Sequence, residues 1–386
     1  MGWHGHFKDL LRIAGGVAAW SGQRRDARLS LARRVQGGSG RLRWSVVATV
    51  SEPAPLVITF VAACFARGAA EVQLYLDTPQ PAVEAVLAGV PGCVLIRCDA
   101  AYWRAAPGGR PWAPSDRQRY NLQRAYDASA VDWLLHIDAD EFLSASGDVA
   151  AALAALPESC VVAQVAVAER VYLAAPDPEN IFDGVFRRPN PPRLQPQVDA
   201  IDGAVARFLR QGMTSYPSSK AFFRTGRGLQ ADVHSARNVS VAEVGNLPGW
   251  RLFHFDGLTL QSWISKKQRT LAQQPGWQAF AEARRAQLAA IVAADATPGG
   301  LAALYLSIKQ LSPERASALT ALELITPGDL DLRGDLARVL PGLAVDLSVA
   351  GYDGHAVSYV ARRAEGWLGR IGSGLRRRIR GLLGRA

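Results

Sequence analysis

The sequence predicts an α/β protein with a mostly parallel sheet, helices on both faces of the sheet and a helical C-terminal region. Two observations lead to this prediction. From Trp44 onward, short apolar runs rich in β-branched residues alternate with longer segments of helical pattern, and such alternation is typical of a parallel sheet covered on both faces. The length of 386 residues and the hydrophobic content of 49% also allow an ample core.

The alternation is regular up to residue 138. The predicted strands are 44–50, 71–77, 93–99 and 132–138, and the predicted helices are 55–68, 81–89 and 115–129. Gly68 ends the first helix and Gly89 follows the second, as glycine commonly does at a helix C-terminus. Ser115 and Gln118 have the spacing of a capping box and predict the start of the third helix.

Beyond residue 138 the pattern is less regular. Further strands are predicted at 160–173, 219–225, 231–240 and 250–257, and helices within 261–295 and 298–350. The Pro-rich stretch 174–197 has neither period, and its length favours a lid or an acceptor-facing loop, with a disordered insertion as the alternative. The predicted domains are a basic helical segment 1–43, an α/β domain 44–260, a helical region 261–350 and a basic tail 351–386.

The net charge of +10 comes from the two ends of the chain. Residues 1–43 hold nine Lys or Arg and two Asp, residues 362–386 hold eight Arg and one Glu, and the part between them is mildly acidic. At helical spacing, the apolar residues of the tail fall on one face: Trp367, Leu368, Ile371, Leu375, Ile379, Leu382 and Leu383. A basic amphipathic helix of this kind predicts contact with an anionic membrane surface. Docking of the tail on its own domain is the alternative, and nucleic acid is not expected because no recognition fold accompanies the arginines.

The sequence also bears on location. No uninterrupted apolar run is long enough to span a bilayer, and the N-terminal residues lack the features of a secretory signal. We therefore expect a cytoplasmic protein that lies on the inner face of the membrane where the tail binds it. The four cysteines have no paired or metal-binding spacing, so reduced structural thiols are expected at Cys64, Cys93, Cys98 and Cys160.

The stretch VDWLLHIDADEFL, residues 131–143, places Asp138, Asp140 and Glu141 together at the end of a predicted strand. Ligands of parallel sheets bind at this end of the strands, where Asp77 and Asp99 also fall. Clustered carboxylates repel one another unless a positive partner lies among them. An Asp-x-Asp pair offers the hard oxygen ligands that Mg²⁺ and Mn²⁺ prefer, together with substrate phosphates. The pattern predicts a divalent cation that carries a nucleoside diphosphate.

Several later motifs follow this one in order. They are Ser219-Lys220, Val233-His234, the FHFDG run 253–257 and the SWISKKQR run 262–269. Together with the pattern D-W-x-x-x-x-D-x-D-E-F at 132–142, the series resembles the family 2-like glycosyltransferases of the GT-A fold, over about residues 44 to 270. One departure is Ser51-Glu52 after the first strand, where that family usually has Asn-Glu.

The resemblance implies a role for individual residues. Mn²⁺ or Mg²⁺ would be held by Asp138 and Asp140, with His234 as a third metal ligand or a diphosphate contact. Donor contacts would come from Glu52, Asp77, Arg117, Asn121 and His254, with Arg117 and Asn121 one helical turn apart. The departing phosphates would be stabilised by Lys220, Lys266 and Arg269. His254 has an alternative interpretation as a half-buried histidine without a ligand.

The catalytic base of an inverting transfer should have no metal to bind, which leaves Asp256, Glu141 and Asp232 as candidates. Of these, Asp256 is slightly favoured. Glu141 has a second interpretation, as an acceptor of backbone N–H groups in the turn after the strand. The sequence does not choose among them.

The function that the resemblance implies is a metal-dependent glycosyltransferase, with residues 44–260 as its catalytic domain. It would move a sugar from a nucleotide donor, with a UDP-sugar favoured, to a glycan, lipid or polymer acceptor in polysaccharide biosynthesis. One alternative is a nucleotidyl- or phosphotransferase, which would favour a Gly-rich or basic phosphate loop that TVSEPAP, residues 49–55, does not supply. A non-catalytic, membrane-associated scaffold is another.

Overall fold

The computed structural model describes residues 42–144, 147–273 and 276–355. The predicted N-terminal segment, except for its last two residues, and the amphipathic stretch 362–386 lie outside the described residues. Among the residues described, no helix combines the length and the apolar character needed to cross a bilayer.

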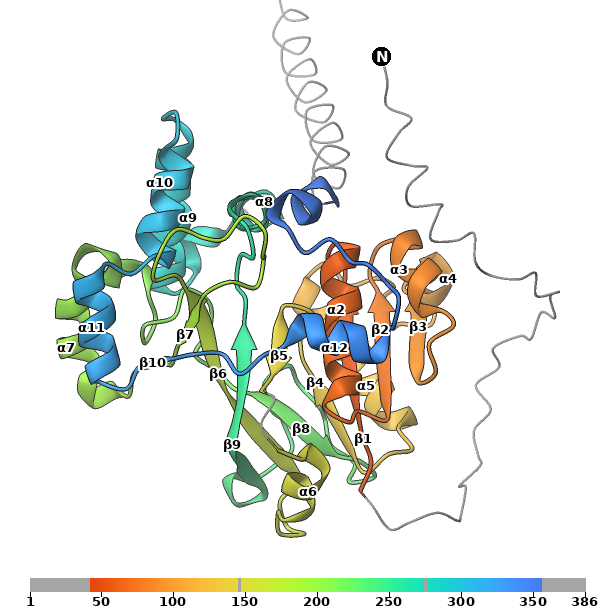
Figure 1. Cartoon of the computed structure of the whole chain (residues 1–386). Coiled ribbons are helices and arrows are strands. Elements are labelled where there is room, and N and C mark those ends of the chain that lie inside the picture. The colour runs from red at the N-terminus through yellow and green to blue at the C-terminus, as the bar shows by residue number, and fades with distance from the viewer. Residues whose placement is uncertain (1–41, 145–146, 274–275, 356–386) are drawn as a thin grey trace, which may run out of the picture. The chain divides into compact units, whose positions relative to one another are not determined.

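One sheet of ten strands organises the described chain. The strands are β1 Trp44–Val50, β2 Glu71–Leu76, β3 Cys93–Arg97, β4 Trp133–His136, β5 Glu141–Leu143, β6 Val162–Val171, β7 Val185–Arg187, β8 Lys220–Arg224, β9 Val244–His254 and β10 Ile325–Thr326. The main path runs β10-β7-β6-β8-β4-β1-β2-β3, and β9 pairs with both β5 and β6 (Figure 1).

Helices surround this sheet. They are α2 Ala54–Ala66, α3 Pro81–Leu87, α4 Ala100–Trp103, α5 Pro114–Ala128, α6 Val149–Ala154, α7 Gln195–Asp202, α8 Leu260–Gln273, α9 Glu282–Asp295, α10 Gly300–Lys309, α11 Pro313–Ala321 and α12 Leu332–Val339. Short 3-10 helices lie at Pro192–Leu194, Gly203–Phe208, Val241–Glu243 and Trp277–Ala279.

The strands β4-β1-β2-β3 are all parallel to one another, and β8 joins β4 in the antiparallel direction. Alternate side chains of β1 enter two different cores. Val46 and Val50 pack in the core that includes α2, whereas Val47 packs in the core that includes Leu122 of α5. Helices therefore cover both faces, and the predicted α/β class with a helical C-terminal region is confirmed.

Three local predictions are wrong. The segment 231–240 is not a strand, because its only pairing is an isolated bridge between Ala231 and Ala236. The stretch 174–197 is not wholly irregular, since it contains β7 and the start of α7. Helix α5 begins one residue earlier than the capping box predicted, with Pro114 in the first turn and no side-chain cap. Proline suits that position because its fixed φ is already helical and its missing N–H is not needed there.

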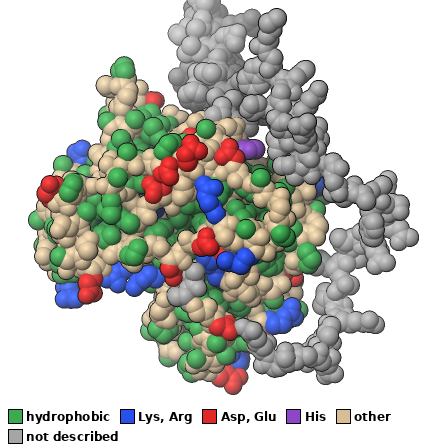
Figure 2. All heavy atoms as spheres, viewed as in Figure 1, with side chains coloured by type: hydrophobic (Ala, Val, Ile, Leu, Met, Phe, Trp, Pro, Cys, Tyr) green, Lys and Arg blue, Asp and Glu red, His purple; other side chains and the backbone are tan. Residues whose placement is uncertain are grey.

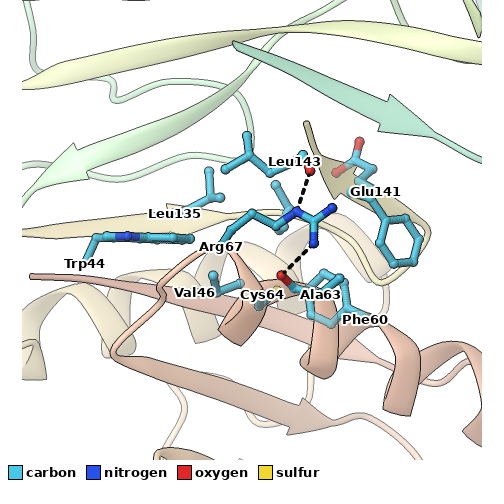
Figure 3. Close-up of a pocket in the computed structure, with 11 residues that line it drawn as sticks. Trp44, Val46, Phe60, Ala63, Cys64, Arg67, Leu135, Glu141 and Leu143 are labelled. Carbon is cyan, nitrogen blue, oxygen red and sulfur yellow. Dashed lines mark hydrogen bonds between the residues drawn. The ribbon is translucent and has the colours of Figure 1, made fainter. Parts of the chain in front are cut away.

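Helix α12 returns from the C-terminal region to pack on α2 (Figure 1). The contact is centred on Arg67, a buried arginine just after α2. Its Nε donates to the carbonyl oxygen of Leu143 at 3.0 Å, and its guanidinium pairs with the buried Asp335 of α12. Arg67 extends into a small cavity whose wall includes Glu141 (Figure 3). This pair ties the C-terminal helices to the sheet.

The face shown in Figure 2 carries acidic and basic side chains in separate small groups among apolar and uncharged atoms. The described part of this face has no extended basic surface. The domain boundaries expected from the sequence at residues 260 and 350 remain predictions.

The Arg67–Asp335 pair gives a stability prediction. Asp335→Ala leaves a buried guanidinium without its carboxylate, and we expect the free energy of unfolding to fall by about 3–5 kcal/mol. Arg338→Ala removes the exposed second partner of Asp335 and should cost less than about 1 kcal/mol. Urea unfolding followed by circular dichroism measures both. Equal effects of the two substitutions would contradict a special role for Arg67.

Candidate active site

Charged side chains follow one another along the carboxyl edge of the parallel strands. The order β8-β4-β1-β2 places Lys220, Asp138, Glu52 and Asp77 in that sequence, because β8 starts where the antiparallel β4 ends. Neighbouring strands lie about 4.8 Å apart, so this row extends over roughly 14 Å. All four residues were expected at one site, Asp77 and Asp138 from their place at strand ends and Glu52 and Lys220 from the family resemblance.

The turn after β4 is built from its own carboxylates. Glu141 Oε2 accepts from the backbone N–H of Asp138 at 2.9 Å and lies 3.2 Å from Lys220 Nζ. Asp138 accepts from Lys220 Nζ at 2.7 Å and from Gln118 Nε2 at 2.6 Å. The turn interpretation of Glu141 is confirmed, and Gln118, expected in a helix cap, instead contacts the Asp-x-Asp motif.

Charge compensation determines the protonation of this turn. Burial by itself would lower the pKa of Lys220, but Asp138 and Glu141 raise that pKa above its ordinary value. Burial would raise the pKa of Asp138, yet the Lys220 charge holds it well below the ordinary value. Burial raises the pKa of Glu141. Lys220 is therefore a fixed cation between two carboxylates of unequal acidity.

A second cationic group surrounds Asp140. Its Oδ2 lies 3.6 Å from His254 Nε2 and 3.4 Å from Lys266 Nζ, and Lys266 Nζ also lies 3.0 Å from Asp256 Oδ1. Burial opposes protonation of His254, but the nearby Asp140 carboxylate outweighs it and raises the pKa of His254 to about 9. The raised pKa thus favours the imidazolium form of His254 at neutral pH, paired with Asp140. A histidine satisfied in this way within the protein also agrees with the alternative that His254 binds no ligand.

Strand register explains why His254 lies among carboxylates. It stands opposite Glu141 on β5 and opposite Glu169 on β6, and directly paired residues of neighbouring strands point to the same face. Ser215 Oγ is 3.1 Å from His254 Nδ1. The three strands therefore bring two glutamates and one cation into a single row.

Glu169 is a buried hub that the sequence analysis missed. It accepts from the backbone N–H groups of Thr214 and Ser215, both at 2.9 Å, and from both of their hydroxyls. Lys309 Nζ lies 3.2 Å from Glu169 Oε1 and 3.3 Å from Asp256 Oδ2. Burial favours the neutral acid, but Lys309 lowers the pKa of Glu169 to about 2. Its signal in the sequence is a charged residue inside an apolar strand.

Asp256 lies at the bottom of the site and is almost fully buried. Besides its two lysine partners, its Oδ2 accepts from the Thr214 hydroxyl at 3.1 Å. Burial alone would raise the pKa of Asp256, but Lys266 and Lys309 hold it well below the ordinary value. The favoured base candidate is therefore an ionised carboxylate shared between two lysines.

The other end of the row is organised by arginines. Asp77 pairs with Arg110 at 2.9 Å and with Arg117 at 3.0 Å, and Arg117 also donates to the carbonyl oxygens of Pro111 and Trp112. Asn121 is fully buried. Its amide donates to Thr49 Oγ1 and accepts from the Tyr102 hydroxyl, so it contacts the protein interior and not the edge.

Glu52 stands between the two groups. Its Oε2 accepts from the Ser51 N–H at 2.7 Å. Burial and the negative charge of Asp140 raise the pKa of Glu52 to about 7. The last described helical turns, 349–355, also reach this region, since Thr259 Oγ1 donates to Asp353 Oδ1 at 2.5 Å. Tyr352 is buried there, and burial, with the Glu52 and Asp140 charges, raises the pKa of its phenol.

The remaining predicted residues lie near the row without joining it as ligands. His234 Nδ1 is 3.0 Å from the Ser219 carbonyl oxygen, and its ring faces Tyr216. Asp232 pairs with Arg119 and Arg237. Arg269 lies on α8 one turn beyond Lys266. Within the described ranges, no group of three or more His, Cys, Asp or Glu side chains is arranged to hold a metal ion.

Comparisons with known proteins are distant. No family model and no curated protein matches the sequence. Among solved structures, S. aureus TarS 1–349 is similar at 11% identity and a TM-score of 0.29, over 78% of this chain and 81% of that chain. The same fragment in complex with UDP gives 10% and 0.27, over 78% and 81%. A CMP:2-keto-3-deoxy-manno-octonic acid synthetase with CTP gives 13% and 0.23, over 77% and 96%. At this distance, neither a reaction nor a substrate follows from the similarity.

The raised pKa of His254 makes stability depend on pH. A protonated His254 favours the folded state, so its contribution is complete below pH 6.5 and is lost as the pH rises through about 9. We expect His254→Gln to lose less stability than the wild-type protein between pH 6.5 and pH 9. Urea unfolding at both pH values tests this, with the exposed His355→Gln as control. Identical losses in all three proteins would show that His254 is not an imidazolium.

Proposed function

We propose that this protein is a metal-dependent glycosyltransferase that uses a nucleoside-diphosphate sugar, with UDP-sugars as the first donors to test. The observation that carries the proposal is the order of charged groups along the sheet edge. Arginine-paired Asp77 stands at one end, and the lysine-paired carboxylates Asp138 and Asp140 stand at the other. An elongated ligand with a polar base and a diphosphate matches this order.

The length of the edge supports the same ligand. Three strand spacings of about 4.8 Å separate β8 from β2, which is roughly the extent of a nucleoside diphosphate. Asp77 and Arg117 would contact the nucleoside, as the resemblance implies, and Glu52 would lie along its middle. The sugar would then project beyond Asp138 and Asp140 toward β8.

The donor set suits a hard divalent cation such as Mg²⁺ or Mn²⁺. The side chain of Asp138 is 31% exposed and that of Asp140 is 15% exposed, so both are partly open to solvent, as a site for a phosphate-bound cation requires. Mg²⁺ commonly takes only one or two protein carboxylates and completes its shell with phosphate and water, so two aspartates suffice without His234. When bound, the ion would stabilise the negative charge of the departing diphosphate.

Lys266 is the side chain that the proposed reaction depends on most. It is 39% exposed, far more than the buried Lys220, and bridges Asp140 and Asp256. A flexible ammonium in this place would turn to donor phosphates, whose charge exceeds that of a carboxylate. Asp256 would then lose one of its two lysines, and its pKa would rise. Donor binding would in this way make Asp256 a better proton acceptor for the incoming hydroxyl.

The proposal predicts nucleotide binding that depends on the motif. Asp140→Asn should weaken UDP binding in the presence of Mn²⁺ by about 10- to 100-fold, the loss expected for one charged contact. Asp127→Asn, on the exposed end of α5, is the matched control and should leave UDP binding unchanged. Isothermal titration calorimetry measures both. Unaltered binding in Asp140→Asn would contradict the proposal.

The products separate the alternatives. Incubation with Mn²⁺ and UDP-, GDP- and TDP-sugars should release the nucleoside diphosphate, as seen by mass spectrometry. Release of a sugar 1-phosphate would indicate transfer of the nucleotidyl group, and release of a nucleoside monophosphate would indicate transfer of a sugar phosphate. No turnover with any donor would favour the scaffold. Contact of residues 362–386 with an anionic membrane remains a proposal.

The role of Asp256 as base has its own test. Asp256→Asn keeps the shape of the side chain and one acceptor oxygen for a lysine but removes its charge and basicity, so turnover should fall by about 100-fold or more. The acidic limb of the pH profile should disappear at the same time. Glu141→Gln is the comparison variant, because Glu141 accepts the Asp138 N–H in the turn after β4. A pH profile unchanged by Asp256→Asn would exclude it as the base.

A further inference from the structure

We propose that Tyr216, backed by His234, is an aromatic platform that binds the pyranose ring of the acceptor sugar. The inference rests on the proposed function and adds an acceptor subsite to it. The sequence analysis assigned no role to Tyr216.

The first argument is position. Strand β8 is antiparallel to β4, with Ala221 opposite His136. The residues before Lys220 therefore run past the end of β4 and alongside Asp138. Tyr216 lies in this segment, on the side of Asp138 that is away from Glu52 and Asp77. The nucleoside is proposed to bind on the opposite side, beside Glu52 and Asp77. A sugar that projects beyond the diphosphate, and the acceptor that meets it, would lie on this side.

The second argument is that the segment is held at both ends. Before Tyr216, the N–H groups of Thr214 and Ser215 both donate to the buried Glu169 at 2.9 Å. After it, the carbonyl oxygen of Ser219 accepts from His234 Nδ1 at 3.0 Å. Only three residues, 216–218, lie between these anchors. An exposed side chain on such a short, anchored span loses little conformational freedom when a ligand binds.

The third argument is exposure and ring geometry. Tyr216 is 55% exposed, although it follows directly on two side chains that are bound to a buried hub. Its ring centroid lies 6.5 Å from that of His234, at an interplanar angle of 50°. Tyrosine offers an apolar ring with a polar tip, which suits a ligand that has an apolar face and hydroxyls at its edge.

His234 is held by the backbone of the same segment. The Ser219 carbonyl can only accept a hydrogen bond, so Nδ1 of His234 donates to it at 3.0 Å. This bond fixes the His234 ring beside Tyr216. A hexopyranose, with C–H groups on one ring face, suits an aromatic platform of this kind.

The platform is also coupled to the reaction centre. Ser215, the residue before Tyr216, has its hydroxyl 3.1 Å from His254 Nδ1, and His254 Nε2 lies 3.6 Å from Asp140. A ring stacked on Tyr216 would thus be next in sequence to Ser215, whose hydroxyl contacts the histidine that pairs with Asp140.

The test uses the full chain with Mn²⁺ and UDP and simple glycosides as probes: methyl β-glucopyranoside, methyl β-galactopyranoside and methyl α-mannopyranoside. Saturation-transfer NMR measures glycoside binding, and calorimetry measures UDP binding. At least one glycoside should bind the wild-type protein. Tyr216→Ala should weaken that binding about tenfold, as expected for the loss of one stacked ring, while Tyr216→Phe keeps it. Val241→Ala, an exposed residue outside the site, should change nothing.

The outcomes separate this inference from the proposed function. A wild-type protein that fails to bind UDP contradicts the proposed function and the acceptor subsite with it. UDP binding with no glycoside bound, or with glycoside binding unaltered in Tyr216→Ala, overturns the platform alone. An equal loss of UDP and glycoside binding in Tyr216→Ala would place the ring on the donor and overturn its acceptor role.

Discussion

The rest of the site depends on pairing buried carboxylates with buried cations. Asp138, Asp140, Glu169 and Asp256 would repel one another and could not remain ionised in the interior if they stood alone. Lys220, Lys266, Lys309 and His254 each contact two of the carboxylates at the site. Because most of these contacts are buried, charges and dipoles are already oriented before any ligand arrives, which is the arrangement that favours electrostatic catalysis.

This pairing also joins distant parts of the chain. Lys220 opens β8, Lys266 lies on α8 and Lys309 ends α10, whereas their carboxylate partners lie on or just after β4, β6 and β9. The helices after residue 260 therefore supply cations to a site whose carboxylates come from the sheet. The buried Arg67–Asp335 pair makes a similar connection between the end of α2 and α12. Helices and sheet hold the site together by charge as well as by apolar packing.

The same pairing suggests how the proposed reaction would proceed. In a site where every charged side chain is paired with another, the pairing changes only when a ligand of higher charge enters. The exposed Lys266 is the group that such a ligand would draw away, and Asp256 is the group that would then gain basicity. Tyr216 follows Ser215, whose N–H donates to Glu169, and would hold the acceptor beside this exchange.

How much of the fold was predictable depended on the range of the interactions. Strands β1, β2 and β4 and helices α2, α3 and α5 were predicted to within about two residues, because each buries a local apolar pattern. The predictions failed at 174–197 and 231–240. In the first, β7 is a short strand that exists through pairing with β6 and β10, and in the second a strand-like composition finds no partner strand. A local pattern contains no information on either outcome.

For the site, the sequence by itself determined which residues could take part. Clustered acids at strand ends identified Asp77, Asp138 and Asp140, because strand ends and residue chemistry are local properties. The resemblance of the later motifs to a known family added Lys220, His254, Asp256 and Lys266 as expected members of the same site. Tertiary structure alone decided their partners. It added Gln118, Glu169 and Lys309, turned Asn121 inward and set His234 beside Tyr216, because strand register and helix packing bring together residues far apart in the chain. Electrostatic energy depends on those distances, so the charge of each group followed from the fold and not from the motif.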